Sequence, residues 1–192
     1  MQLVGEGGPD AVSVREAARR AGVSPGAPFR HFPSRDALMN AVAEEAQRRF
    51  RAEIEAALRD APPGDPLGRF RRLGIAYLRW AMQNPTHFEI ISSRRFFDHD
   101  RSAEVSGDNA ELIALTERTL AEASAAGQLG THELKQVRIA SRALVYGFAR
   151  MHIDGQLPRW GVTDAEAEAM AASVVDLFIA GIASRAAPAA KV

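Results

Sequence analysis

The residues with the clearest chemical purpose lie near the N-terminus, and their arrangement suits binding rather than catalysis. Ser13 followed by Glu16 is a capping box, which starts a helix. Gly22 ends that helix, since glycine accepts the positive φ of a tight turn. Ser24 then caps a second helix with Pro25 at its first position, where a missing N–H costs nothing. Two short helices joined by a glycine turn predict a helix-turn-helix, whose second helix enters the DNA major groove by its N-terminal end.

The predicted motif runs from Ser13 to Phe32, and it has a second interpretation. Any pair of helices in a bundle can carry small residues and a glycine turn, so spacing alone supports DNA binding and plain helix packing about equally. In either arrangement Val23 is expected to fill the gap between the two helices.

Catalytic and metal-binding chemistry is poorly supported. Asp98, His99 and Asp100 could bind a metal ion, but they stand in a charged stretch, and a site needs three or four converging ligands. The chain has no cysteine, which excludes disulfides, thiolate metal sites and cysteine nucleophiles. No nucleophile–base pair or phosphate-cradling glycine loop is recognisable. The sequence therefore predicts no enzyme, no metal site and no cofactor.

Composition and charge distinguish a soluble protein from a membrane-spanning or secreted one. The 192 residues carry 24 basic and 24 acidic side chains and no net charge, so any binding of phosphates must depend on local arrangement. No stretch approaches the roughly 20 apolar residues that span a bilayer. The N-terminus lacks the basic stretch and apolar run of a signal peptide. A soluble, cytoplasmic protein is expected.

Apolar residues recur at intervals of three and four, and nothing alternates like a strand for more than a few residues. The pattern predicts an all-α chain, with a small N-terminal helical unit over residues 1–45, a larger helical bundle over 46–185 and a frayed tail over 186–192. A loop is expected over 94–108. The expected helices beyond the N-terminal motif span about 38–58, 67–84, 86–93, 109–126, 131–154 and 163–182.

Residues 12–42 resemble the TetR family of bacterial transcriptional regulators. The resemblance rests on the two short helices, on the stretch Phe29-Arg-His-Phe-Pro-Ser-Arg35 and on the long helix that follows. The stretch from Leu144 to Leu157 resembles a C-terminal domain type of that family with the motif Trp-His-Gly, where Tyr146-Gly147 takes the place of His-Gly. The resemblance covers nearly the whole chain. It implies an N-terminal helix-turn-helix DNA-binding domain and a C-terminal helical-bundle domain for ligand binding and dimerisation.

The resemblance also implies DNA contacts. Arg15 matches a position that often reaches a base edge, and Arg30 matches one that reaches a base or the backbone. Phe29, His31 and Arg35 match phosphate-contacting positions. The start of the second helix offers few hydrogen bonds, so apolar contact with thymine methyl groups is one available form of readout there. The implied DNA-binding set is Ser13, Arg15, Ser24, Pro25, Gly26, Ala27, Phe29, Arg30, His31 and Arg35.

The chain departs from the family pattern in three places. Phe29 replaces the usual Tyr and lacks its hydroxyl, and Pro28 replaces the usual Leu and removes one backbone hydrogen bond. Residues 1–9 resemble only the last turn of the family's first helix. An alternative interpretation follows, in which the chain is a helical ligand-binding or interaction module that has lost DNA binding with that helix.

Bulky residues in the C-terminal part suggest an effector pocket between bundle helices. Each alone is more often ordinary core, but as a set the resemblance makes them candidates for the pocket. The predicted pocket residues are Trp80, Phe88, Ile91, Phe97, Tyr146, Arg150 and Met151.

Small residues on the last two helices allow close packing, either within one subunit or between two copies. The resemblance favours a homodimer, whose twofold symmetry would match a palindromic operator in double-stranded DNA. The expected function is a repressor that a small-molecule ligand releases from its operator. The predicted interface residues are Ala140, Leu144, Gly147, Val174, Leu177, Phe178 and Gly181.

Overall fold

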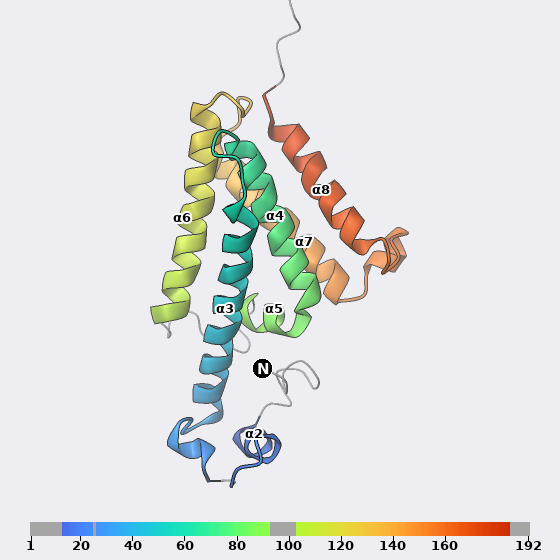
Figure 1. Cartoon of the computed structure of the whole chain (residues 1–192). Helices are drawn as coiled ribbons and strands as arrows, with labels where there is room; N and C mark the ends of the chain where they lie inside the picture. Colours follow the sequence, from blue (N-terminus) through green and yellow to red (C-terminus); the bar gives the residue numbers. More distant parts are fainter. Residues whose placement is uncertain (1–12, 25, 93–102, 185–192) are drawn as a thin grey trace, which may run out of the picture. The chain divides into compact units, whose positions relative to one another are not determined.

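The computed structural model describes residues 13–24, 26–92 and 103–184, and the regular elements within these ranges are helices (Figure 1). One isolated bridge pairs Leu129 with Ala183. The prediction of an all-α chain is confirmed. The elements are α2 (Val14–Arg20), η2 (Pro28–Arg30), α3 (Arg35–Arg59), α4 (Pro66–Gln83), α5 (Pro85–Ser92), α6 (Ala103–Ala125), α7 (Leu134–Ile153), η4 (Leu157–Trp160) and α8 (Ala167–Ile182), of which η2 and η4 are 3₁₀ helices.

Local chemistry accounts for the boundaries of the long helices. The α3 helix follows Ser34, whose Oγ accepts a hydrogen bond from the backbone N–H of Ala37 at 3.1 Å. The next helix, α4, starts with Pro66 at its first position, and Asp65 Oδ1 accepts from the N–H of Gly68 at 2.8 Å. Capping side chains of this kind satisfy N–H groups that have no partner within the helix.

The α6 helix begins earlier than the sequence indicates. It starts at Ala103, so the expected loop over 94–108 is wrong in its last residues. The charged and irregular sequence of this stretch suggested a loop, and Gly107 and Asp108 have low helix propensity. The Asp108 carboxylate, however, accepts a hydrogen bond from Arg51 Nη1 of α3 at 2.7 Å. The same guanidinium lies 2.6 Å from Glu111. This contact between α3 and α6 offsets the low helix propensity of Gly107 and Asp108.

Contacts along the chain divide it into two compact units. The first comprises residues 1–52 and 83–111, and the second comprises residues 53–82 and 112–192. The first unit is therefore discontinuous, because it takes up α5 and the start of α6. The boundary near residue 45 between a DNA-binding and an effector-binding domain is a functional division and remains a prediction.

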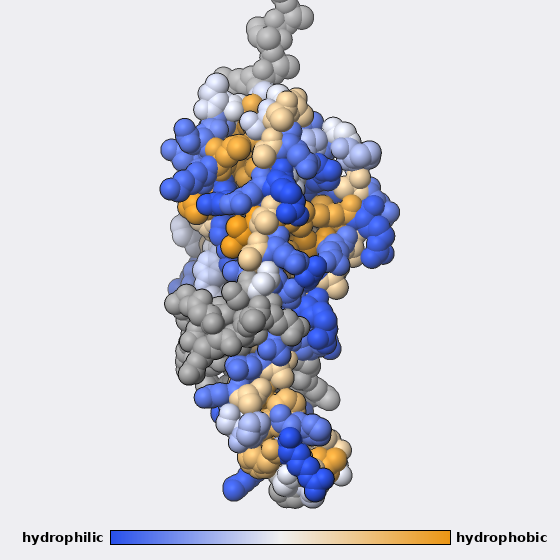
Figure 2. Space-filling view, turned by 90° about the vertical axis from the view of Figure 1, so that its left-hand side faces the viewer, coloured by the Kyte–Doolittle hydropathy of each residue, from blue (hydrophilic) through white to orange (hydrophobic). Residues whose placement is uncertain are grey.

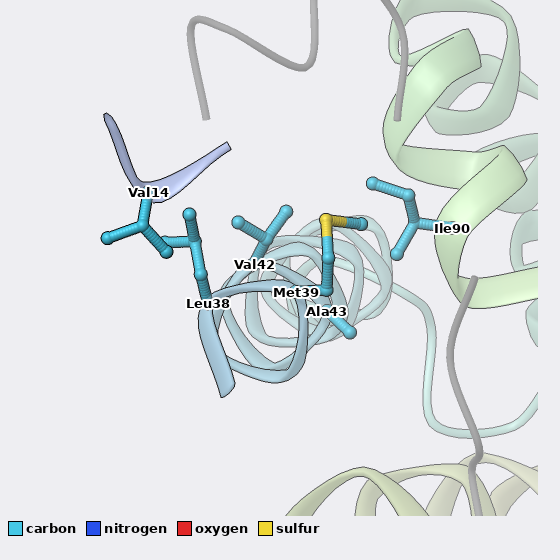
Figure 3. Close-up of a cluster of buried hydrophobic side chains, with 6 residues drawn as sticks. All are labelled: Val14, Leu38, Met39, Val42, Ala43 and Ile90. Atoms are coloured by element: carbon cyan, nitrogen blue, oxygen red, sulfur yellow. The ribbon is translucent and has the colours of Figure 1, made fainter. Parts of the chain in front are cut away.

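The core of the first unit joins three helices (Figure 3). Val14 of α2 lies beside Leu38 of α3, and Met39 of α3 extends toward Ile90 of α5. Met39 is 2% exposed and Ile90 is fully buried. Phe32 packs against this cluster from the connection between η2 and α3. An α5 residue therefore belongs to the same core as α2 and α3.

The second unit is built around α4, α7 and α8. A methyl group added at Gly74 of α4 would lie 3.4 Å from Val175 of α8, so the two helices approach closely there. Arg71 Nη2 of α4 donates to Asp176 Oδ2 of α8 at 2.9 Å. On the face that Figure 2 shows, which is the left-hand side of Figure 1, hydrophilic side chains surround smaller apolar areas in the upper part.

Tyr77 connects α4 to α7 and gives the second unit a pH dependence. Its hydroxyl accepts a hydrogen bond from Arg142, whose guanidinium carbon lies 5.0 Å from the centre of the ring. Burial raises the pKa of Tyr77 to about 12, and the positive charge of Arg142 opposes part of that rise. The folded chain therefore holds the phenol proton more tightly than the unfolded chain.

The raised pKa of Tyr77 predicts a loss of stability in alkali. Below pH 10 the phenol is protonated in both states, so its contribution is fully present. As the pH rises from 10 through 12, only the unfolded chain ionises, and the free energy of unfolding should fall by ~2 kcal/mol. Urea unfolding across this range should show the decline, and Tyr77→Phe should flatten it. An equally steep decline in Tyr77→Phe would contradict this assignment.

Candidate nucleic-acid interface

The α2 helix starts at the predicted N-cap. Ser13 has extended backbone angles, and its Oγ accepts from the N–H of Glu16 at 3.1 Å. The Glu16 carboxylate forms ion pairs along the helix, with Arg19 Nη2 at 2.6 Å and Arg20 Nε at 3.3 Å. The first of the two expected capping-box hydrogen bonds is thus present, and the carboxylate turns toward the last turn of the helix.

These ion pairs reduce the net positive charge that Arg19 and Arg20 give to the surface of α2. The hydrogen bond from Arg19 is the main cause that lowers the pKa of Glu16 to about 2, so this carboxylate is ionised at neutral pH. It offsets part of the positive charge of Arg19 and Arg20. The Arg15 side chain is exposed and forms no hydrogen bond or ion pair with the side chain of any other described residue. Arg15 is consequently the α2 side chain best placed to bind an anion.

The turn after α2 has the predicted glycine. Gly22 has a φ of +66°, which residues with a side chain rarely adopt. The N–H of Val23 donates to the carbonyl of Ala18 at 3.1 Å, which closes the helix end. The expectation that Val23 fills the gap between two helices is wrong, because this side chain is 46% exposed.

The second helix of the motif is shorter than predicted. Its regular part is the single turn η2 (Pro28–Arg30), while the N–H of Ala27 donates to the carbonyl of Ser24 at 3.0 Å. Pro28 has no N–H and cannot continue a hydrogen-bonded helix from Ser24. Without a longer helix, no helical face covers Val23. Pro25, the predicted first residue of this helix, lies outside the described residues.

The residues around η2 combine basic and aromatic side chains. Arg30 and His31 are exposed, and Arg35 is exposed at the first position of α3. Phe29 is 45% exposed. By contrast, Phe32 turns inward to the core. Phe32 thereby anchors this basic segment to α3.

The predicted DNA-binding residues share one property, which is access to solvent. Among those that the structure describes, all are exposed except Ala27, which is half-buried. The first unit holds them on α2, η2 and the start of α3. Guanidinium groups in such a setting suit phosphate oxygens and guanine edges. The arrangement can bind an anionic polymer such as DNA. Among its described residues, no nucleophile lies within hydrogen-bond distance of a general base.

Comparison with known proteins identifies the family. Residues 1–42 match the family model for bacterial regulatory proteins of the tetR family. Residues 70–178 match the model for the tetracyclin repressor-like C-terminal domain, and this match alone spans more than half of the chain. The chain belongs to the TetR family.

Individual relatives agree with this assignment. The HTH-type transcriptional repressor KstR of Rhodococcus jostii (strain RHA1) is 29% identical over 142 residues, which are 73% of this chain and 63% of that protein. The chain thus spans less than two thirds of the curated relative. A structure of a protein with unknown function from Rhodococcus sp. RHA1 has a TM-score of 0.79 and 28% identity, over 95% of this chain and 91% of that one.

A more distant structure shows the fold alone. The ketosteroid transcriptional regulator KstR2 of Mycobacterium tuberculosis has a TM-score of 0.73 at 16% identity, over 96% of this chain and 91% of that chain. A TetR fold is therefore present at low sequence identity. The assignment of the C-terminal part to the Trp-His-Gly type stays a prediction.

The predicted effector-pocket residues of this TetR chain are distributed over both compact units. Phe88 and Ile91 belong to the first unit, with Phe88 buried and Ile91 half-buried. Phe97 lies outside the described residues. The pocket set as a whole stays a prediction. In the second unit Trp80 is buried, whereas Tyr146, Arg150 and Met151 are half-buried.

The second unit has a small cavity that the sequence did not indicate. It lies between α4 and α8 and measures about 60 Å³, below the roughly 300–1,000 Å³ of ligand pockets. Arg79 and Glu168 flank it with an ion pair of 3.6 Å. None of the predicted pocket residues lines it. Its lining consists of Ile75, Arg79, Met82, Glu168, Ala171 and Ala172.

The residues predicted to form a dimer interface lie on α7 and α8, which pack on one another. Leu177 is 75% exposed, and Ile139, which the prediction omitted, is 58% exposed. The positions where Gly147 and Gly181 would carry a Cβ are open. Ala140 and Gly181 are exposed, and the remaining members, Leu144, Gly147, Val174 and Phe178, are half-buried.

Two other types of site are absent from the described ranges. No helix there is long and apolar enough to cross a bilayer. No group of His, Asp and Glu side chains in those ranges could hold a metal ion. The Asp98-His99-Asp100 stretch, considered above as a weak metal candidate, lies outside them.

Proposed function

We propose that this chain is a DNA-binding transcriptional regulator that represses its target genes. The observation that carries the proposal is the helix-turn-helix segment, which holds exposed Arg15, Arg30, His31 and Arg35 within a stretch that matches the family model over residues 1–42. That match supports DNA binding over a module that has lost it. The name of the curated relative, a transcriptional repressor, supports the direction of regulation.

The proposed active form is a homodimer in the cytoplasm. The apolar side chains exposed on α7 and α8, above all Leu177 and Ile139, would be removed from water by a second copy. A twofold axis would place two helix-turn-helix segments on successive major grooves, about 34 Å apart. Such a dimer would recognise a palindromic operator.

Release from DNA would depend on a small-molecule effector in the C-terminal part of the chain. The effector must favour a conformation in which the two DNA-binding segments no longer match the operator spacing. The shift in the equilibrium cannot exceed the effector's difference in affinity for the two conformations. The candidates for effector contact remain the pocket residues predicted above.

Binding to the promoter region of its own gene tests the proposal. The wild-type chain should form a complex that depends on a palindrome and weakens steeply as salt rises. Arg15→Ala should weaken it about tenfold or more and relax base preference at one position, as for a base contact. His31→Ala should weaken binding more uniformly across sequences. Fluorescence anisotropy at two salt concentrations measures these effects.

The matched control is Arg118→Ala, which removes an exposed positive charge from α6 of the second unit. It should leave the affinity for the operator within about twofold of wild type. If Arg118→Ala weakens binding as much as Arg15→Ala, net charge rather than the proposed interface determines affinity. If wild type forms no palindrome-dependent complex at either salt concentration, the repressor function is wrong.

A further inference from the structure

Two tyrosines orient the guanidinium group of Arg142 on α7. Its guanidinium carbon lies 5.0 Å from the centre of the Tyr77 ring and 5.4 Å from the centre of the Tyr146 ring. Its Nη1 also donates a hydrogen bond to the Tyr77 hydroxyl. Tyr77 belongs to α4 and Tyr146 to α7, two helices of the second unit (Figure 1). Contacts of this kind fix the direction of a guanidinium without neutralising its charge.

The positive charge of Arg142 has no carboxylate partner in the described part of the chain. Arg142 is exposed, so a ligand can reach it from solvent. Tyr77 does not supply a negative charge, because burial raises its pKa to about 12 and the phenol stays protonated at neutral pH. Most other arginines of α4 and α7 differ from Arg142, since they form ion pairs with Asp or Glu. These are Arg69, Arg71, Arg79, Arg138 and Arg150.

The surroundings of Arg142 favour an anion with a single charge. One turn earlier on α7, Arg138 forms an ion pair with Glu117 of α6, so the neighbouring positive charge is offset. A carboxylate carries one negative charge, and its two oxygens match the paired N–H groups of a guanidinium. A phosphate monoester carries roughly twice that charge and would call for a second unpaired basic group. The charge balance around Arg142 therefore matches a carboxylate better than a phosphate.

We propose that Arg142 binds the carboxylate group of the effector, with Tyr77 and Tyr146 holding the guanidinium in place. This inference rests on the proposed function, in which a small molecule binds the C-terminal part of the chain. It adds the chemical class of that molecule, an organic carboxylate. It also adds two residues, because Arg142 and Tyr77 are absent from the predicted pocket set. The carboxylate would accept paired hydrogen bonds from the guanidinium in place of hydrogen bonds from water.

Carboxylates and their neutral amides test the inference, because the members of a pair differ in the charge of one group. The probes are octanoate, decanoate and phenylacetate, each compared with its amide by isothermal titration calorimetry on the full chain. At least one carboxylate should bind with saturation, and roughly tenfold or more tightly than its amide, as for a hydrogen-bonded charge. The same carboxylate should weaken the complex of the chain with its operator, measured by fluorescence anisotropy.

Variants then assign the binding to the guanidinium. Arg142→Gln should bind the carboxylate and its amide about equally. Arg142→Lys should recover only part of the preference, since an ammonium group lacks the paired geometry. Tyr77→Phe keeps the ring but loses the hydroxyl that accepts from Arg142, and it should weaken carboxylate binding roughly twofold to tenfold. Because the carboxylate and amide pairs are measured with wild type, a variant that folds poorly does not block the test.

The matched control is Arg72→Gln. Arg72 is exposed on α4, but the helical repeat places it on a different face from Tyr77. Its replacement removes the same charge from the same unit and leaves the two tyrosines and Arg142 in place. Arg72→Gln should keep the full preference for the carboxylate. An equal loss of preference in Arg72→Gln and Arg142→Gln would attribute binding to the overall charge of the unit and overturn the inference.

The remaining outcomes separate this inference from the proposed function. If no carboxylate binds wild type more tightly than its amide, the inference is wrong, while the regulator function still stands on its operator complex. Carboxylate binding that leaves operator affinity unchanged also overturns it, because the bound molecule is then not the effector. If Arg142→Gln becomes monomeric in sedimentation equilibrium, Arg142 serves the contact between copies instead. If wild type forms no palindrome-dependent complex, the proposed function fails and this inference fails with it.

Discussion

Ile90→Ala should destabilise the chain by about 2–5 kcal/mol and abolish or greatly weaken DNA binding, although this residue lies far in sequence from the helix-turn-helix. Ile90 is fully buried and packs in the cluster that contains Val14 of α2 and Met39 of α3. Truncation removes buried apolar surface and leaves a cavity, and these two terms together set the expected size of the loss. Because the cavity opens in the cluster that also holds Val14 of α2, the packing of α2 on α3 should weaken.

Urea unfolding measures the loss of stability, and hydrogen exchange locates it. Amides of α2 and of the first half of α3 should lose protection in Ile90→Ala. The control is Ile113→Ala, which makes the same type of truncation at a 46% exposed position and should change stability by less than about 0.5 kcal/mol. Wild-type stability in Ile90→Ala would show that α5 does not complete this core.

Leu177→Asp should convert the proposed homodimer into a folded monomer and lower operator affinity by about 100-fold or more. Leu177 is 75% exposed on α8, so its replacement costs little within one subunit. In a twofold interface the change would place two carboxylates in an apolar setting, where unpaired charges are strongly unfavourable. A monomer also loses the gain in affinity that comes from linking two half-sites.

Sedimentation equilibrium measures the oligomeric state of Leu177→Asp, and anisotropy measures its affinity for a full palindrome and for a single half-site. The half-site affinity should stay near that of wild type. Ile113→Asp introduces the same charge at an exposed residue of α6 and should leave the dimer intact. A Leu177→Asp chain that remains dimeric would show that this part of α8 is not in the interface.

Features determined by nearby residues were predictable from the sequence. The all-α class followed from the spacing of apolar residues. The N-cap at Ser13 and the positive φ of Gly22 followed from the conformational preferences of those two residue types. The break between α3 and α4, at the stretch from Ala61 to Pro66, followed from its prolines and glycine. In each case the relevant neighbours are within a few positions along the chain.

Features that depend on distant residues could not be predicted in this way. The sequence indicated a helix around Ile90, but it did not show that Ile90 shares a cluster with Met39 and Val42. The early start of α6 depends on Arg51, which lies far from Asp108 along the chain. Distant contacts of this kind leave no trace in a local sequence window.

The exposure of the candidate residues agrees with the prediction, whereas the shape of the segment that carries them differs from it, and their role in DNA binding stays a prediction. Arg15, Arg30, His31 and Arg35 are exposed in one compact unit, as an interface with DNA requires. The second helix was overestimated because Ser24 is a good cap, whereas Pro28 limits the regular part to one 3₁₀ turn. The exposure of Val23 follows from that shortening, and it could be seen only in three dimensions.

The discontinuity of the first compact unit has a consequence for synthesis on the ribosome. Chains are made from the N-terminus at about 5–20 residues per second. Several seconds therefore separate the completion of Ala43 from the addition of Ile90, and in that interval the apolar face of α3 lacks its α5 partner. We expect a nascent chain released before Ile90 to be prone to aggregation and degradation. Incomplete translation products would then not compete with finished regulators for the operator.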